Sequence, residues 1–91
     1  MSSTAPTLPP SGWKVLYDGP LNSWLTRDPR PSTLAIAPVV EWLRGCEAMG
    51  PPSDARPVRD DFYIAQLREA RVTIEYLVVE HEFLMIIKRI S

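Results

Sequence analysis

The stretch that decides the fold is residues 72–90, VTIEYLVVEHEFLMIIKRI. Its two apolar runs, 72–79 and 83–90, are rich in the β-branched and aromatic residues that strands favour. Glu80, His81 and Glu82 separate the two runs and predict a turn. Because a turn this short joins antiparallel neighbours, the runs are predicted to pair as a hairpin.

A third strand is predicted immediately upstream, over residues 62–68, FYIAQLR. Glu69 and Ala70, which are predicted to form a tight turn, join it to the run at 72–79. Consecutive short turns make the three strands sequential neighbours in space. The end of the chain is therefore predicted to be a three-stranded antiparallel meander.

Side chains alternate between the two faces of a sheet, and this alternation sorts residues 72–90. In the run at 72–79, one face carries Val72, Ile74, Tyr76 and Val78, and the other carries Thr73, Glu75, Leu77 and Val79. The run at 83–90 is apolar on both faces, with Leu84, Ile86 and Ile90 on one and Phe83, Met85 and Ile87 on the other. Two helices cover only one face of so small a sheet, so a second apolar face would meet a partner. We predict that this partner interface consists of Phe83, Met85 and Ile87.

The first half of the chain predicts one strand and two helices. Residues 13–17 are predicted to form a short strand, and Asp18 caps a short helix over 20–27 with Pro20 in its first turn. Ser32 or Thr33 caps a longer helix that ends at Gly50. Its apolar stripe consists of Ile36, Val39, Val40, Leu43 and Cys46.

Proline residues shape the ends of this longer helix and the segment after it. Because Pro38 fits best in a first turn, the regular helix is predicted to start near Ala37. Pro51 and Pro52 prevent its continuation, and residues 51–61, PPSDARPVRDD, are predicted to be a polar connecting loop.

These elements define the fold class as α+β: a short N-terminal strand, two helices, then a three-stranded antiparallel meander with the helices on one face. The 91 residues suffice for one domain. We assign residues 1–12, which are small, polar and Pro-rich, to a flexible tail, and residues 13–91 to the single domain.

Composition narrows the functional classes. Ten basic residues nearly balance eleven acidic ones, so the net charge of −1 gives the whole molecule no attraction to nucleic acid. Most of the basic residues are Arg, which suits phosphate recognition at a local patch. The single Cys46 excludes an internal disulfide and a Cys-rich zinc site, and it fits a reducing cytoplasm. No apolar run is long enough to span a membrane, and no metal or cofactor is predicted.

The order of strand, helix, helix and meander resembles the RelE/HigB/ParE superfamily of small bacterial toxins from toxin–antitoxin pairs. Four features carry the resemblance over residues 13–91. They are the helix that ends at Gly50 before a polar loop, the strand 62–67 that runs directly into REARV at 68–72, the central-strand pattern VTIEYLVV with its Tyr76, and the apolar last strand that closes on Lys88 and Arg89.

The resemblance implies growth arrest and a cognate antitoxin as partner. Ribosome-dependent members of the superfamily cut messenger RNA through attack of a ribose 2′-hydroxyl on the neighbouring phosphate. This chemistry requires a general base, a general acid, and cations that stabilise the negative charge on the phosphate. The resemblance therefore implies an endoribonuclease without a cofactor, with Arg68, Arg71 and Arg89 binding the substrate. Its candidate catalytic residues are Arg71, Glu75, His81, Lys88 and Arg89.

Several of these residues keep a second interpretation. His81, in a turn between two glutamates, is either a general base or a solvated turn residue. The arginines form either a phosphate patch or solvated strand-end charges. The family often carries an Arg three residues before the central Tyr, and that position is Thr73 here. Adjacent strand residues point to opposite faces, so only one of Lys88 and Arg89 is expected on the open face.

Two other functions stay open for the whole chain. The first is a catalytically inert toxin-fold protein that binds a host protein through its open sheet face, as the gyrase-poisoning branch of the superfamily does. The apolar residues of the last strand favour it. The second is an accessory domain whose open face is closed by homodimer formation.

Overall fold

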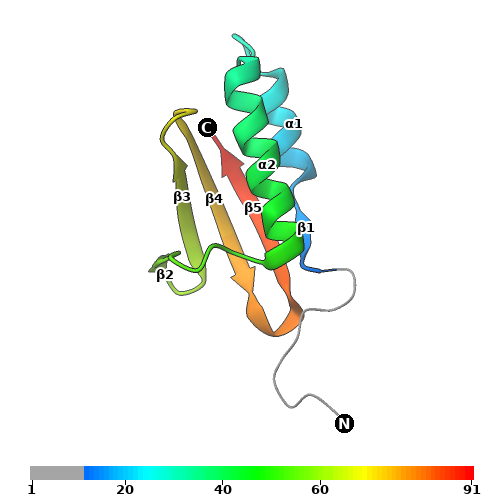
Figure 1. The fold of residues 1–91 in the computed structure, drawn as a ribbon, viewed down its shortest axis with the longest axis vertical. Helices are drawn as coiled ribbons and strands as arrows, with labels where there is room; N and C mark the ends of the chain where they lie inside the picture. Colours follow the sequence, from blue (N-terminus) through cyan, green and yellow to red (C-terminus); the bar gives the residue numbers. More distant parts are fainter. Residues whose placement is uncertain (1–11) are drawn as a thin grey trace.

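Two helices lie side by side on one face of a five-stranded sheet in the computed structural model, which describes residues 12–91 (Figure 1). The elements, in chain order, are β1 Lys14–Leu16, α1 Asp18–Thr26, α2 Thr33–Met49, β2 Pro57–Arg59, β3 Phe62–Leu67, β4 Val72–Val79, the 3₁₀ helix η1 Glu80–Glu82, and β5 Leu84–Ile90. The fold class is therefore α+β, as predicted. Of the predicted tail, residues 1–11 lie outside the described residues.

The sheet has the strand order β1-β5-β4-β3-β2. The strands β3, β4 and β5 form the predicted antiparallel meander, but the prediction of a three-stranded sheet was wrong. β1 adds to β5 as a parallel strand, since the two helices supply the crossover that parallel pairing needs. β2, inside the predicted loop 51–61, adds to β3 as a second edge.

A β-bulge interrupts β5 at Lys88. Tyr76 on β4 pairs with Ile87, while the preceding Glu75 pairs with Arg89, so Lys88 is an extra residue without a partner on β4. The extra residue reverses the alternation that regular strand geometry would give. Ile90 therefore points to the helices, and Arg89 shares the open face with Glu75.

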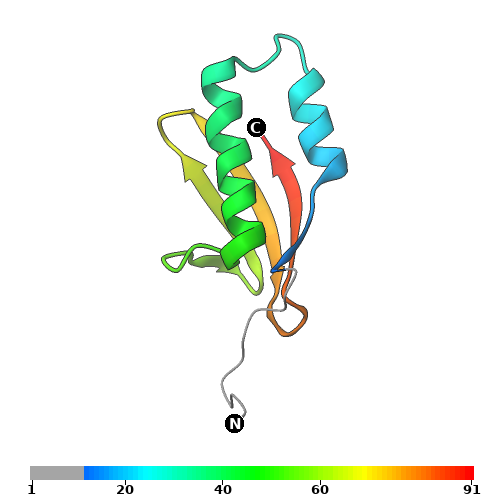
Figure 2. The ribbon, with the colours of Figure 1, turned by 45° about the vertical axis from the view of Figure 1, so that its right-hand side comes forward.

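The core lies between the helices and the sheet. It is built from Val72, Ile74, Tyr76 and Val78 of β4, the predicted face, together with Met85, Ile87 and Ile90 of β5. Against them pack Trp24 of α1 and Val39, Leu43 and Cys46 of α2. Figure 2 shows α1 and α2 next to each other over the sheet, with β5 between them.

The predicted partner interface was wrong for two of its three residues, because Met85 and Ile87 belong to this core, while Phe83 packs against it. Met85 is 0% exposed and Ile87 is 2% exposed. They lie opposite Val78 and Tyr76 in the register, on the face that the helices cover. Phe83 is half-buried, and its ring packs edge-on against Trp13 with centroids 5.4 Å apart.

Both helices begin earlier than predicted. α1 begins at Asp18, two residues before Pro20. α2 begins at Thr33 and contains Pro38 in its interior, so the predicted start near Ala37 was wrong. Because Pro38 has no amide hydrogen, the Leu34 carbonyl is the one acceptor that loses its helical hydrogen bond to the proline. Leu34 is exposed, so water can donate a hydrogen bond to that carbonyl. The predicted end at Gly50 is confirmed, since the Gly50 amide donates to the Cys46 carbonyl over 2.8 Å.

Candidate functional site

Most of the predicted cations gather at one end of the sheet, which we call the basic end. Arg68 and Arg71 lie in the turn between β3 and β4, and Lys88 and Arg89 lie near the end of β5. Backbone hydrogen bonds of 2.8 and 2.9 Å between Thr73 and Ser91 hold the end of β5 beside the start of β4. The loop between α1 and α2, which follows Arg27, lies at this end as well (Figure 1).

The opposite end of the sheet carries acidic residues, which we call the acidic end: Asp60, Asp61, Glu80 and Glu82. The Val78 amide donates to the Asp61 carbonyl over 3.1 Å, so the turn before β3 lies beside the end of β4. The near-neutral net charge therefore conceals a separation of charge along the strands. An anionic ligand would be attracted to the basic end and repelled from the acidic end.

His81 lies at the acidic end, away from the arginines. It is in η1, which follows the last residue of β4, whereas Arg71 precedes the first residue of that strand. At about 3.3 Å per residue, a strand of this length separates the two by more than 20 Å. The His81 Nε2 atom lies 3.3 Å from the Glu82 carboxylate, and both side chains are mostly exposed. The structure does not bring His81 into a common site with the predicted phosphate ligands.

Glu75 and Arg89 are brought together on the open face of the sheet. The two residues are direct cross-strand partners in the β4–β5 pairing. Such partners have Cβ atoms roughly 5 Å apart, so a carboxylate and a guanidinium share one small area. Glu75 is half-buried and Arg89 is exposed. The arrangement places a carboxylate next to a guanidinium, a group that suits phosphate recognition.

An apolar row also crosses the open face, and the sequence prediction missed it. The register aligns Leu16 with Ile86, Ile86 with Leu77, and Leu77 with Phe62, so the row runs across β1, β5, β4 and β3. Leu16 is 46% exposed, and the other three are half-buried. Leu77 and Ile86 could have been found from strand alternation alone, but Leu16 required knowledge of the β1–β5 pairing. The row offers an apolar contact surface to another molecule.

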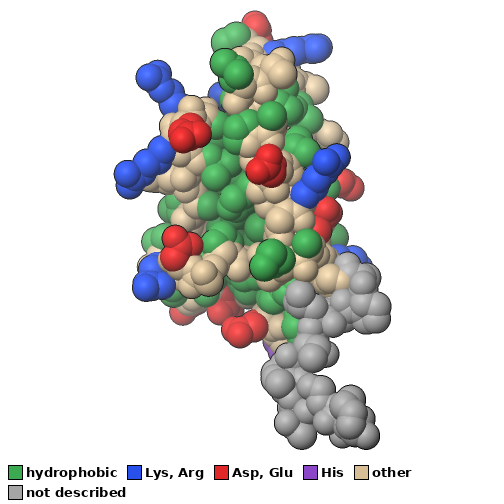
Figure 3. All heavy atoms as spheres, in the orientation of Figure 1, with side chains coloured by type: hydrophobic (Ala, Val, Ile, Leu, Met, Phe, Trp, Pro, Cys, Tyr) green, Lys and Arg blue, Asp and Glu red, His purple; other side chains and the backbone are tan. Residues whose placement is uncertain are grey.

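A groove on the helix side lies between α2 and β3. Two adjoining hollows of about 500 and 470 Å³ meet at Trp42, because the helices leave the inner side of β3 partly uncovered. The Tyr63 and Tyr76 rings stack with centroids 5.4 Å apart, and Trp42 packs edge-on against Tyr76. Figure 3 shows hydrophobic side chains along this groove and charged side chains on its rims. Such an aromatic floor suits a flat ring or an apolar side chain.

Neither Cys46 nor Tyr76 is poised to act as a nucleophile or a base. Burial, with a smaller contribution from Glu47, raises the pKa of the Cys46 thiol to about 12. Burial likewise raises the pKa of the Tyr76 hydroxyl to about 12. Both groups are therefore neutral at physiological pH. Within residues 12–91, no three His, Cys, Asp or Glu side chains gather as metal ligands would, and no helix has the length and apolarity to cross a membrane.

Comparisons with protein-family models, with curated proteins and with solved structures give no match for this chain. The resemblance to the RelE/HigB/ParE superfamily thus continues to rest on the order of the elements and on the sequence pattern.

Proposed function

We propose that this chain is a cytoplasmic, RelE/HigB-like toxin of a toxin–antitoxin system, which arrests growth by cutting messenger RNA on the ribosome. The observation that carries the proposal is the pairing of Glu75 with Arg89 on the open face of the sheet. This pair lies next to the basic end, where Arg68 and Arg71 can contact neighbouring phosphates of an RNA strand.

The proposed reaction uses these residues in distinct roles. The Glu75 carboxylate takes the proton of the ribose 2′-hydroxyl, and the 2′-oxygen forms a bond to the adjacent phosphorus. Arg89 stabilises the negative charge that develops on the phosphate oxygens. The bond from phosphorus to the 5′-oxygen breaks, and the leaving oxygen takes a proton from water. The products are a 2′,3′-cyclic phosphate and a free 5′-hydroxyl.

Inducible expression in bacteria tests this proposal. We expect growth arrest with rapid loss of messenger RNA for the wild type. Glu75→Gln should reduce RNA cleavage by roughly 100-fold or more, since it removes the base while keeping the size of the side chain. Arg89→Ala should cause a loss of similar size. His81→Ala is the matched control and should keep full cleavage, because His81 lies at the acidic end. Unchanged cleavage by Glu75→Gln would refute the assignment.

The apolar row favours a second candidate function, inhibition of a host protein that binds to the open face. In that case expression would cause arrest with intact messenger RNA. Leu77→Lys, in the middle of the row, should abolish arrest, because it places a charge where an apolar partner surface packs. Gln66→Lys adds the same charge to the open face outside the row and should leave arrest unchanged. A wild-type chain that causes no arrest would exclude both functions.

A further inference from the structure

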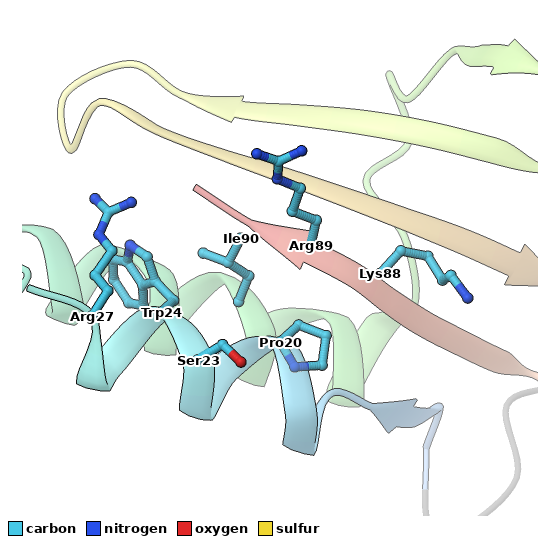
Figure 4. Close-up of a pocket in the computed structure, with 7 residues that line it drawn as sticks. All are labelled: Pro20, Ser23, Trp24, Arg27, Lys88, Arg89 and Ile90. Carbon is cyan, nitrogen blue, oxygen red and sulfur yellow. The ribbon is translucent and has the colours of Figure 1, made fainter.

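A pocket of about 340 Å³ lies between α1 and the last residues of β5 (Figure 4). Three cationic residues line it: Arg27, Lys88, and Arg89, whose side chain lies on the open face of the sheet opposite Glu75. None of the residues in its wall is acidic, and the rest of the wall is Pro20, Ser23, Trp24 and Ile90. No ion pair involves the three cations in the part of the chain that the structure describes. A hollow lined by the cations Arg27 and Lys88, with no acidic residue in its wall, favours an anion.

Trp24 supplies an independent observation that points to a ligand. Its side chain is 1% exposed, and its indole nitrogen is the one buried side-chain polar atom without a hydrogen-bond partner among residues 12–91. A buried N–H without an acceptor is unfavourable, and an acceptor that reaches it recovers the lost free energy. Figure 4 shows the indole nitrogen between the side chains of Arg27 and Ile90. Because the Arg27 side chain lies beside this nitrogen, an acceptor bound by Arg27 would lie next to the indole N–H.

The β-bulge explains how Lys88 comes to line the pocket. In a regular strand, Lys88 and Arg89 would point to opposite faces of the sheet. Because Lys88 is the extra residue of the bulge, the local backbone bends and Lys88 is free of a partner on β4, so it lines the pocket while the Arg89 side chain stays opposite Glu75. Bulges commonly re-aim side chains in this way at functional sites.

We propose that this pocket binds a phosphate dianion, either free phosphate or the terminal phosphate of a phosphomonoester. The two cations Arg27 and Lys88 match a double negative charge, while the Trp24 indole and the Ser23 hydroxyl are neutral donors for further phosphate oxygens. In Figure 4 the Arg27 side chain lies beside Trp24, the Arg89 side chain extends away from α1, and the Lys88 ammonium extends along β5. Binding would require Lys88 to change rotamer toward the anion. The site does not depend on RNA cleavage, since it is assigned as a binding site alone.

Nuclear magnetic resonance of the full chain tests the proposal through the indole N–H signals of its three tryptophans. Inorganic phosphate is added at constant ionic strength. We expect the Trp24 indole signal to shift along a saturating curve, while the signals of Trp13 and Trp42 move little. A common drift of all three signals, or no shift of the Trp24 signal, would overturn the proposal.

Variants and analogues of the ligand sharpen the test. Arg27→Gln and Lys88→Gln should each weaken phosphate binding by roughly threefold to tenfold, since each removes one charged donor. Arg56→Gln removes the same charge from the loop between α2 and β2 and should leave binding unchanged. If all three variants weakened phosphate binding equally, the attraction would come from the net charge of the protein. That result would refute a built site.

The charge of the ligand is tested with two small esters. Methyl phosphate, a monoester, should bind about as well as phosphate, which would show that the pocket accepts a terminal phosphate on a larger molecule. Weak binding of methyl phosphate beside tight binding of phosphate would restrict the ligand to the free ion. Dimethyl phosphate carries one charge and should bind at least tenfold more weakly. Equal binding of dimethyl phosphate would refute the assignment to a dianion.

Discussion

Gly50 lies against the indole ring of Trp13, so closely that a Cβ atom at position 50 would be 2.5 Å from the indole Nε1 atom. The Trp13 amide in turn donates to the Glu47 carbonyl over 2.8 Å, and this hydrogen bond satisfies one of the free carbonyls at the end of α2. The end of the long helix and the start of β1 are thus fitted to each other. This contact fixes where β1 enters the sheet.

Gly50→Ala should therefore destabilise the protein strongly. Gly50 has φ 85° and ψ −169°, a backbone region that is essentially restricted to glycine, and the added methyl group would displace Trp13. We expect a loss of roughly 3 kcal/mol in the free energy of unfolding, measured by urea denaturation. Gly45→Ala is the control, because nothing lies within 4 Å of its Cβ position inside α2. Gly45→Ala should raise the free energy of unfolding by roughly 0.5–1 kcal/mol. Equal losses of stability in both variants would contradict this account.

Arg71→Gly should stabilise the turn between β3 and β4. Arg71 has φ 56°, in the left-handed region that costs a residue with a Cβ atom about 1 kcal/mol, and its amide donates to the Arg68 carbonyl. Glycine removes this cost, but its greater conformational entropy in the unfolded chain offsets part of the gain. The net free energy of unfolding should rise by roughly 0.5 kcal/mol. Arg68→Gly removes the same charge without a positive φ, and thermal unfolding should show no gain for it.

Alkaline pH should weaken the fold, because it ionises two buried groups. The pKa values of Cys46 and Tyr76 rise from 9.0 and 10.0 to about 12 in the folded chain. Folding therefore favours the neutral forms, and their contribution is complete below about pH 9 and is lost as the pH rises toward 12. We expect urea denaturation to give on the order of 2 kcal/mol less stability at pH 10.5 than at pH 8. The folded Cys46 thiol should also resist alkylation at pH 8 and react once the chain is unfolded.

Deletion of Lys88 should leave the fold intact. Without the extra residue, Ile87, Arg89 and Ile90 would still face Tyr76, Glu75 and Ile74 in a regular register, so the core would be unchanged. Circular dichroism and urea denaturation should show a native spectrum and a stability within about 1 kcal/mol of the wild type. Deletion of Ile87 is the comparison, because it would bring the charged Lys88 opposite Tyr76, in the core. If both deletions unfold the chain, the bulge is not where the register indicates.

The meander was predictable from the sequence because its strands are long enough to show alternation. The bounds 72–79 of β4 and its buried face follow directly from the pattern of β-branched and aromatic residues. The end of α2 was predictable for a similar reason, since Gly50 has a single favoured use at a helix terminus. The same strand order brings Arg68, Arg71, Lys88 and Arg89 to one end of the sheet.

The remaining features depend on contacts that no local pattern contains. The strand predicted over residues 13–17 is confirmed by β1, but its pairing with β5, at the other end of the chain, has no local signal. Pro57 and its polar neighbours conceal β2. One extra residue in β5 reversed the faces after Ile87, so Ile90 was assigned to the wrong side and Arg89 could not be assigned to either face. The pocket lined by residues of α1 and β5 could be found only from the tertiary structure.

The shortest strands of the sheet are the two at its edges. β1 and β2 have three residues each, whereas β3, β4 and β5 have six, eight and seven. An unpaired strand edge is a template for edge-to-edge aggregation, and the apolar segments of β4 and β5 have the composition of fibril-forming peptides. β1 pairs with Leu84, Met85 and Ile86 of β5, and β2, with Pro57 as its first residue, pairs with β3, so β4 is paired along both sides and β5 has a β1 partner over these three residues. The short strands at the two edges thus limit the growth of the folded chain into a fibril.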